Sequence, residues 1–312
     1  MRALRSAKRI LILVTVVVIL GVRPAIGEER PQSEAQIVPL LWQVSGRLAS
    51  IFIYGSIHMA PPEALPPPEP VRTAFSRSSR LFTEVPIHEG FAGEVQLQMV
   101  ARMFLPDDVL LSDCLTEAEW QRVVDWATES GLAPWIVDGM QPWVVELMVA
   151  ESRAIPGDFS AEYGLDDYFS RKAAAAGIPA LGLETVAEQL DALSGGALCE
   201  QAASLVATID DARYDDQVFQ LYRAWRAGDV TALARLVEHA FVIDGDSRKY
   251  ARFLTDRNER WVETLVAVLD EDEDDVFVVV GAAHLVGPKS VPELLAERGY
   301  PVRRLLSLDD LQ

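Results

Sequence analysis

The stretch VFVVVGAAHL, residues 276–285, carries the pattern that decides the fold. Residues 276–280 form a nearly continuous β-branched run, which is typical of a strand covered on both faces. The run ends in Gly281, and His284 follows three residues later. A glycine here allows a sharp turn of the backbone where the strand ends. The stretch therefore predicts a buried strand with a histidine just beyond its carboxyl end.

The segment YGSIHM, residues 54–59, repeats this arrangement more than 200 residues earlier, since Gly55 and His58 also follow an apolar run. Side chains just past the carboxyl ends of strands project into the crevice where open α/β sheets bind ligands. If the two strands are neighbours, His58 and His284 meet over that crevice. The chain contains only four histidines, so the repeat singles out these two as candidate ligands.

Other strand-like runs occur near both ends of the chain, with helical periodicity between them. Apolar runs over 37–44 and 47–57 predict a hairpin around Gly46, and further strands are expected at 81–85, 177–181 and 302–306. Apolar residues at helical spacing predict helices at 71–79, 91–104, 117–130, 143–153, 166–175, 201–227, 230–240, 248–269 and 291–298. We expect one α/β domain over residues 28–312, with α+β as the alternative. Its mixed central sheet would be flanked by helices, with a large helical insertion between the N- and C-terminal strand regions.

The first 27 residues have the composition of an export signal. Four basic residues precede the uncharged apolar run Ile10–Val22, whose 13 residues fall short of a membrane span. Small residues before Glu28 offer a cleavage site. This pattern predicts a periplasmic or secreted mature chain without a stable membrane anchor, and an uncleaved N-terminal anchor is the alternative.

Charge and cysteine content narrow the possible partners and the compartment. The formal net charge of −19 makes nucleic acid an unexpected partner, because an acidic surface repels phosphate backbones. Cys114 and Cys199 are the two cysteines. In an oxidising compartment they could form a disulfide, and two buried free thiols are the alternative.

Glu84 ends the strand-like run LFTEVP that follows the first histidine motif. Two imidazoles and a carboxylate suit a divalent metal that keeps open positions for water, and such a metal supports hydrolysis. Burial in an apolar strand would raise the pKa of Glu84 and suit it to base catalysis. The alternative for each histidine is an ordinary hydrogen-bonded polar residue. No His-x-x-x-His pattern exists, which excludes helix-borne zinc protease chemistry.

Two further histidines have weaker claims on a site. His88 follows Pro86 in a loop and is close to Glu84 in sequence, so it is a weak candidate for an outer shell. His239 falls in a helical pattern, where a surface or capping role suits it.

These motifs resemble those of the TraB/GumN family, which is related to the Tiki metalloproteases. That family pairs an early G-[ST]-x-H motif with a carboxylate strand and a late G-x-x-H motif. The corresponding segments here are YGSIHM, LFTEVP and FVVVGAAHLVGPKSVPELLAERGYPVRRL. MQPWVVEL, YGLDDYF, LGLET, LYRAWRAGD and DRNERW are similar to further family landmarks. The likeness covers residues 39–306, and the one departure is Ser56, where many relatives have threonine.

The resemblance implies a site built from His58, His284, Glu84 and Arg257, with both histidines and Glu84 as metal ligands and Glu84 and Arg257 as catalytic groups. It implies manganese or cobalt, with zinc as an alternative, and a peptide or protein substrate. Arg257 would stabilise a developing oxyanion, and a structural ion pair with an acid is its alternative. The resulting hypothesis is an exported, Tiki-like metal-dependent hydrolase. The alternative is a non-catalytic protein that binds metal or haem in the same crevice.

Other landmarks have structural interpretations. Asp166 is expected to cap a helix that begins near residue 167. Glu184 follows a predicted strand end and either belongs to the site or caps a helix. Asn258 is interpreted as a cap or as a group that supports the site, and Trp143 and Trp225 as core residues.

Overall fold

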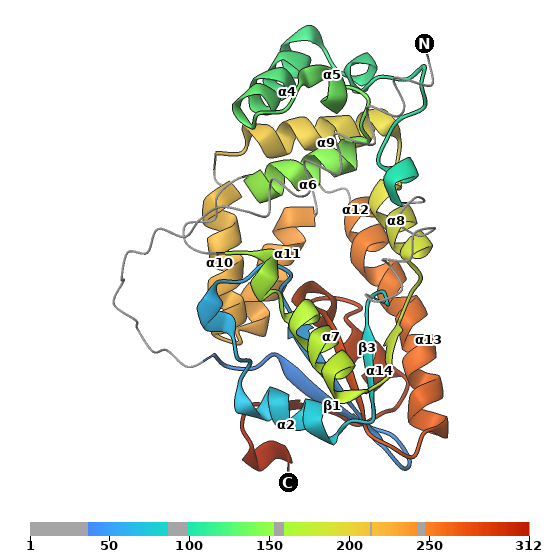
Figure 1. The fold of residues 1–312 in the computed structure, drawn as a ribbon. Coiled ribbons are helices and arrows are strands. Elements are labelled where there is room, and N and C mark those ends of the chain that lie inside the picture. Colours follow the sequence, from blue (N-terminus) through green and yellow to red (C-terminus); the bar gives the residue numbers. More distant parts are fainter. Residues whose placement is uncertain (1–36, 87–98, 153–158, 213, 242–246, 312) are drawn as a thin grey trace. The chain divides into compact units, whose positions relative to one another are not determined.

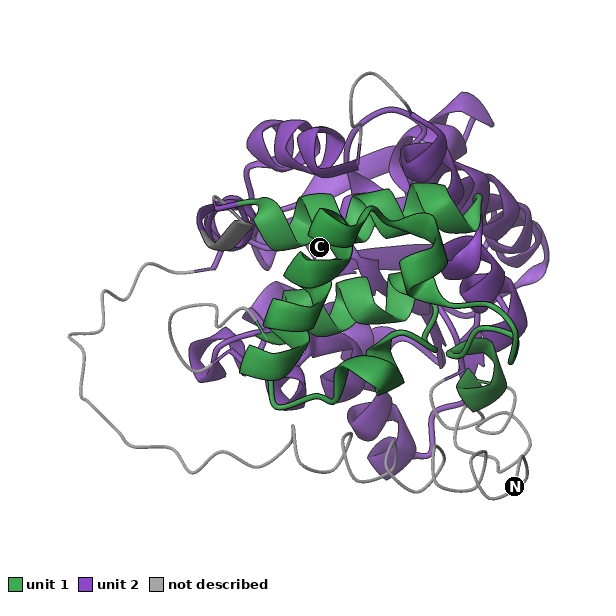
Figure 2. Cartoon of the chain, turned by 90° about the horizontal axis from the view of Figure 1, so that it is seen from above, with its two compact units in different colours: residues 1–35, 96–153, 196–211 green, residues 36–95, 154–195, 212–312 purple. Residues whose placement is uncertain are grey.

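The computed structural model describes residues 37–86, 99–152, 159–212, 214–241 and 247–311. The predicted export signal, His88 and the first part of the helix expected at 91–104 lie outside these residues. Within the described ranges, no helix is both long enough and apolar enough to cross a bilayer. The chain divides into two compact units, which Figure 2 colours separately. The larger unit contains the described residues of 36–95, 154–195 and 212–312, and the smaller contains those of 96–153 and 196–211.

The larger unit is built on a six-stranded sheet in the order β4-β3-β5-β2-β1-β6. The strands are β1 Leu41–Ser45, β2 Ser50–Ser56, β3 Arg80–Thr83, β4 Ala180–Gly182, β5 Val276–Gly281 and β6 Val302–Leu305. β2, β5, β3 and β4 run parallel to one another. β1 is antiparallel to both of its neighbours, so the sheet is mixed, as predicted.

The central strand β5 is buried along Val276–Val280, each residue being inaccessible to solvent. This burial explains the unbroken β-branched run, because helices cover both faces of such a strand. On one face, Phe75 of α2 (Glu69–Arg77) and Phe169 of α7 (Leu165–Ala176) pack against Phe277. Figure 1 shows these two helices in front of the sheet.

Two more helices contact β2, β1 and β6, the three strands that follow β5 in the sheet order. α13 (Asp256–Glu271) contacts β2, and α14 (Val291–Glu297) contacts β1 and β6. Buried Trp261, Leu265 and Leu295 belong to the same core as the strands. The prediction of a mixed sheet flanked by helices is therefore confirmed.

The remaining helices of the larger unit lie mostly between β4 and β5 in sequence. They are α8 Val186–Ser194, α10 Tyr214–Arg226, α11 Val230–Phe241, α12 Arg248–Tyr250, the π-helical turn Ala251–Thr255, and the short 3₁₀ turns Pro62–Ala64, Ala161–Tyr163, Ala282–Leu285 and Asp309–Leu311. Trp225 is buried and donates Nε1–H to the carbonyl of Gly55, which confirms its core role.

The smaller unit is helical. It contains the 3₁₀ turn Leu111–Cys114 and the helices α4 Glu117–Glu129, α5 Pro134–Val137, α6 Pro142–Ser152 and α9 Leu198–Asp210. Cys114 and Cys199 form a disulfide that joins residues 85 positions apart. Trp143 is buried in α6, as expected of a core residue.

One predicted helix is wrong as a single element. The pattern at 201–227 is continuous in sequence, but α9 ends at Asp210 and α10 begins at Tyr214. The break falls where the chain passes from the smaller unit to the larger. The expectation of one domain over 28–312 stays a prediction.

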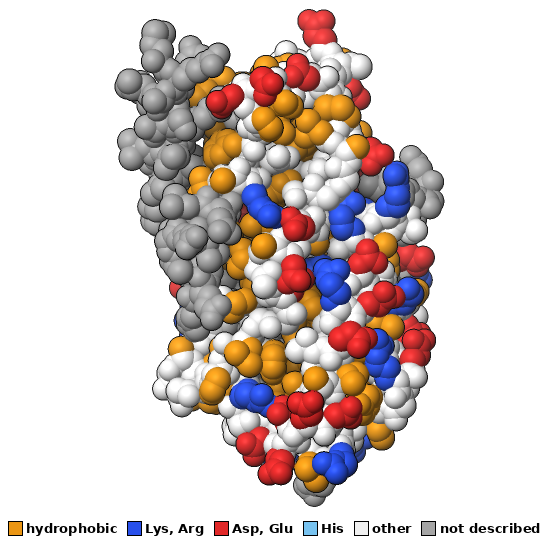
Figure 3. Space-filling model, turned by 90° about the vertical axis from the view of Figure 1, so that its right-hand side faces the viewer, with side chains coloured by type: hydrophobic (Ala, Val, Ile, Leu, Met, Phe, Trp, Pro, Cys, Tyr) orange, Lys and Arg blue, Asp and Glu red, His pale blue; other side chains and the backbone are white. Residues whose placement is uncertain are grey.

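Acidic and basic side chains are interspersed on the surface of the larger unit. Figure 3 shows Asp and Glu next to Lys and Arg on the face that it draws. Lys289 pairs with Glu259, and Arg298 pairs with Glu263. Such surface pairs contribute about 0–1 kcal/mol each, so they do not determine the fold.

Candidate functional site

Three of the predicted site residues follow the carboxyl ends of adjacent parallel strands. β2 pairs with β5 in a register that aligns Ser56 with Gly281, so His58 and His284 leave the same edge of the sheet. β3 pairs with the other side of β5, and Glu84 comes directly after it. The topology therefore brings the two Gly-x-x-His segments and the glutamate together, as the sequence predicts if the strands are neighbours.

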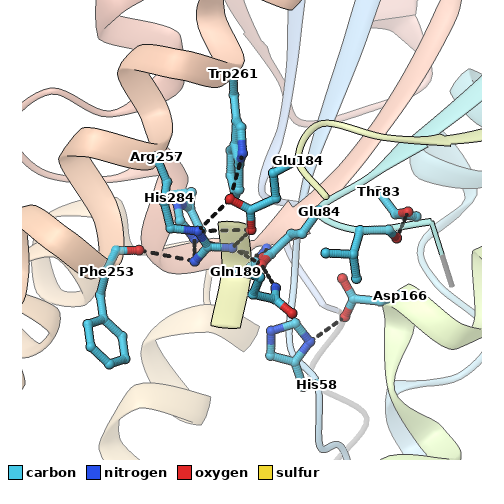
Figure 4. A network of polar contacts seen from close by, with 12 residues as sticks. His58, Thr83, Glu84, Asp166, Glu184, Gln189, Phe253, Arg257, Trp261 and His284 are labelled. Atoms are coloured by element: carbon cyan, nitrogen blue, oxygen red, sulfur yellow. Dashed lines mark hydrogen bonds and ion pairs between the residues drawn. The ribbon is translucent and has the colours of Figure 1, made fainter. Parts of the chain in front are cut away.

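The three side chains meet around Gly281. A β-carbon at this position would lie 3.2 Å from Glu84 Oε1, 3.6 Å from His58 Nε2 and 3.7 Å from His284 Cδ2. The φ angle of Gly281 is −52°, which any residue adopts, so a sharp turn does not explain the glycine. Space is the better explanation, because a β-carbon would lie tightly against Glu84 Oε1 and in van der Waals contact with both histidines. Figure 4 shows their arrangement.

His284 is buried and held in one tautomer by Asn258. The Asn258 Nδ2 amide donates to the carbonyl of Lys289 at 2.9 Å, which turns Oδ1 toward the imidazole. Oδ1 lies 2.6 Å from His284 Nδ1 and therefore accepts its proton. Nε2 is left with a lone pair. Burial lowers the pKa of His284 to about 3 against the opposing charge of Glu84, so the ring is neutral near pH 7.

His58 has a charged partner instead. Its Nδ1 lies 3.0 Å from Asp166 Oδ2, while Ser56 Oγ donates to Asp166 Oδ1 at 2.7 Å. The Asp166 carboxylate raises the pKa of His58 above its usual value. The His58 side chain is 67% exposed, so water screens part of this effect. Since Nδ1 faces Asp166, Nε2 is the nitrogen directed toward Gly281.

Glu84 is buried and is held through both oxygens. Oε1 accepts from the Gly281 backbone N–H at 2.8 Å, and Oε2 accepts from Arg257 Nη2 at 2.6 Å and Gln189 Nε2 at 3.3 Å. Burial, the largest effect, raises the pKa of Glu84, but the charges of Arg257 and His58 and the Gly281 N–H together hold it below its usual range. The expectation of a raised pKa is therefore wrong, because Arg257 carries a permanent charge.

Arg257 links the glutamate, the histidine and a second glutamate. Nη1 donates to the Phe253 carbonyl at 3.1 Å and toward the free Nε2 of His284 at 3.2 Å. Nε donates to Glu184 at 3.0 Å, and Nη2 donates to both Glu184 and Glu84. The ion-pair interpretation of Arg257 is thus correct for this structure, with two carboxylates as partners.

Glu184 belongs to this network rather than to a helix cap. Thr185 is the N-cap of α8 and forms a capping box with Glu188. Glu184 Oε2 accepts from Trp261 Nε1 at 3.3 Å, and the Trp261 ring lies 4.7 Å from the Arg257 guanidinium. Burial raises the pKa of Glu184, while its hydrogen bonds with Arg257 oppose that change.

A π-helical turn precedes Arg257. The turn spans Ala251–Thr255, between α12 and α13, and includes the Phe253 carbonyl that Arg257 contacts. Such turns are frequent at functional sites. The next turn buries Arg257 and Asn258, so two consecutive residues support Glu84 and His284.

The donor atoms fit a divalent cation in type and in part by distance. His284 Nε2 and Glu84 Oε1 lie 3.8 Å apart, and two donors with bonds of about 2.1 Å can lie up to about 4.2 Å apart. In each imidazole, Nδ1 contacts a polar side chain, which is the kind of support that metal-binding histidines usually have. Within the described residues, however, no group of three His, Cys, Asp or Glu side chains is arranged to hold a metal ion. Arg257 Nη1 would have to release His284 Nε2.

Asp166 is the residue whose role the sequence misses. It lies in the first turn of α7, where Gly164 is the N-cap, so the expected capping role is wrong. Gly164 allows the close approach that Asp166 needs, because a β-carbon there would lie 2.5 Å from the His58 carbonyl oxygen. The Gly-x-Asp pattern in YGLDDYF, residues 163–169, is the sequence signal that could have indicated this role. Asn258 does support the site, which agrees with one of its two interpretations.

Comparisons with known proteins agree with the sequence motifs. The model of the TraB/PrgY/gumN family matches residues 40–304. An uncharacterized protein of Treponema pallidum (strain Nichols) is 25% identical over 278 residues, which cover 83% of this chain and 80% of that protein. No solved structure matches.

Proposed function

The chain belongs to the TraB/PrgY/gumN family, and from this premise we propose that it is an exported, metal-dependent hydrolase that cleaves peptide bonds. The observation that carries the proposal is the meeting of His58 Nε2 and Glu84 Oε1 at Gly281, with a neutral His284 Nε2 3.8 Å from the same carboxylate oxygen. The resemblance to Tiki metalloproteases favours a peptide or protein substrate and manganese or cobalt.

The proposed ligands are His58 Nε2, His284 Nε2 and Glu84. A bound divalent ion would polarise a substrate carbonyl and activate water. Asn258 and Asp166 hold the two imidazoles so that Nε2 faces the site in each case. These contacts orient the rings before any ligand arrives, which limits the ordering cost of binding.

Glu84 and Arg257 are the proposed catalytic groups. Glu84 is ionised near pH 7, so its carboxylate can accept a proton from the attacking water, and its lowered pKa makes it a weak base for this step. Arg257 Nη1 points toward His284 Nε2 in this structure. Once that nitrogen takes another partner, Nη1 has an N–H available for the oxyanion that develops on the substrate.

Metal binding by the purified mature chain tests the first half of the proposal. We expect calorimetry with Mn²⁺, Co²⁺ and Zn²⁺ to detect one site. His58→Ala and His284→Ala should each weaken binding at least about ten-fold. His239→Ala is the matched control, because His239 is exposed on α11, and it should bind as the wild type does. Unchanged binding by both site variants would refute the metal site.

A peptide-library cleavage screen with each bound ion tests the second half. We expect cleavage by the wild type and none by Glu84→Gln. An ion-binding protein that cleaves no peptide would instead support the non-catalytic alternative. The absorbance spectrum of the purified protein then distinguishes a haem-binding protein from a metal-binding one. Bound haem absorbs strongly in the visible range, and bound zinc does not.

A further inference from the structure

A cavity that is largely open to solvent lies in the larger unit, between β1, β6, α11 and the segment after His284. Its volume is about 440 Å³, within the range of about 300–1,000 Å³ that small-molecule sites occupy. Its lining is mainly apolar: Trp42, Val230, Thr231, Ala234, Leu285, Val286, Gly287, Ser290, Pro292 and Arg304. The catalytic groups proposed above do not line it, so it is a separate feature.

Arg304 is the charged residue of this cavity. Its guanidinium lies 4.9 Å from the Trp42 ring. Nη2 donates to the carbonyls of Pro39 at 3.0 Å and Gly228 at 2.9 Å. Nε is buried and has no hydrogen-bond partner. No carboxylate among the described residues forms an ion pair with Arg304, and burial lowers its pKa.

This arrangement is unusual for a chain with 47 acidic and 28 basic residues. Acidic partners are plentiful, yet Arg304 is held by neutral carbonyls and an aromatic ring. A partly buried cation without an anionic partner costs free energy that a bound anion would recover. The two carbonyls take the N–H groups of Nη2, so Nη1 is the group that can donate charge-assisted hydrogen bonds to a carboxylate.

We propose that this cavity binds a small monocarboxylate with an apolar body. The carboxylate would contact the Arg304 guanidinium, and the apolar body would lie against Trp42 and Pro292. Leu285 and Val286 directly follow His284 in the chain, so the ligand would contact the segment that carries this histidine. The inference does not depend on the proposed hydrolase activity.

Three eight-carbon probes test the ligand class on the wild-type chain. Octanoate, octan-1-ol and octylammonium share an apolar body and differ in head-group charge. By calorimetry we expect octanoate to bind at least about ten-fold more tightly than octan-1-ol, and octylammonium to bind most weakly. Equal binding of octanoate and octan-1-ol, or no binding of octanoate, would overturn the proposal.

Matched variants locate the site. Arg304→Gln should weaken octanoate binding about ten-fold or more and leave octan-1-ol binding nearly unchanged. Arg303→Gln removes the same charge from the adjacent, exposed residue of β6, which donates to Gln43 and Asp310, and should have little effect. Ala234→Leu narrows the cavity and should weaken both probes. An equal loss of octanoate binding in the two arginine variants would indicate non-specific charge attraction and refute the site.

Discussion

His284 Nδ1 and Asn258 Oδ1 lie 2.6 Å apart, and the Lys289 carbonyl fixes the orientation of the Asn258 amide. This contact keeps the proton of His284 away from the nitrogen that faces Glu84. Replacing Asn258 with Leu removes the acceptor, so we expect divalent-ion affinity to fall about 10–100-fold, as for other groups that orient metal ligands. Asn258→Asp keeps an acceptor and should lose less. Calorimetry with Mn²⁺ would contradict this prediction if the Leu variant binds like the wild type.

The pH dependence of stability should report the buried state of His284. Its pKa is 6.5 when unfolded and about 3 when folded, so the unfolded chain holds more protons between these values. The contribution of His284 to the free energy of unfolding is complete above the unfolded pKa. It is lost as pH falls toward the folded pKa. The slope from this group approaches about 1.4 kcal/mol per pH unit.

Urea unfolding of the metal-free protein between about pH 6 and pH 5 measures that slope. His284→Gln should flatten it, whereas His239→Gln, which changes an exposed histidine, should leave it as in the wild type. Parallel curves for wild type and His284→Gln would show that His284 titrates normally.

Removal of the Arg257 charge should destabilise the fold. Glu84 and Glu184 are each 7% exposed and both pair with this guanidinium. Arg257→Gln leaves buried Glu84 without its arginine and Glu184 with only the half-exposed Arg260, and we expect a loss of about 3–5 kcal/mol in the free energy of unfolding. Arg260 lies 4.0 Å from the same Glu184, but its side chain is 48% exposed, so Arg260→Gln should cost at most about 1 kcal/mol. Similar losses in both variants by urea unfolding would argue against a buried network.

The charge of Asp166 should control the titration of His58. In the metal-free protein, Asp166→Asn keeps the size of the side chain and removes the charge that raises the pKa of His58. We expect the pKa of His58, followed by NMR of its ring protons, to shift down toward 6.5 in this variant. Asp167→Asn, at a half-exposed neighbouring position that pairs with Arg171, is the control. An unshifted His58 in the Asp166 variant would contradict the assigned contact.

The disulfide should stabilise the smaller unit. Cys114 and Cys199 link the 3₁₀ turn before α4 to the start of α9. Replacing both with serine should reduce stability by about 2–5 kcal/mol, chiefly through a larger unfolded ensemble. Hydrogen exchange in α4 and α9 measures this effect, and exchange rates like those of the wild type would contradict it.

The sequence predicted the strands well because their apolar runs are short and bounded by glycine or proline. The order β3-β5-β2 could not be predicted from the sequence, because it depends on contacts between residues about 200 positions apart. The helix break after Asp210 was also missed, because apolar periodicity continues across it while the chain leaves one unit for the other.

In the candidate site, sequence reasoning found the side chains and missed how they are connected. His58, Glu84, Arg257 and His284 do lie in one network. The direction of the Glu84 pKa was wrong because burial was the only influence readable from its strand, whereas Arg257, 173 positions away, reverses it. The sequence position of Asp166 predicts a helix cap, because its contact with His58 spans 108 positions and leaves no local pattern.

The number of residues in the π-helical turn Ala251–Thr255 determines the direction in which the side chains of α13 face. Each residue of a helix advances the side chains by about 100°, so deletion of one residue within the turn would swing Arg257 and Asn258 sideways together. Glu84 would lose its cation and His284 its hydrogen-bond acceptor in a single step. The contacts of both side chains therefore depend on the length of this short segment as well as on their own chemistry.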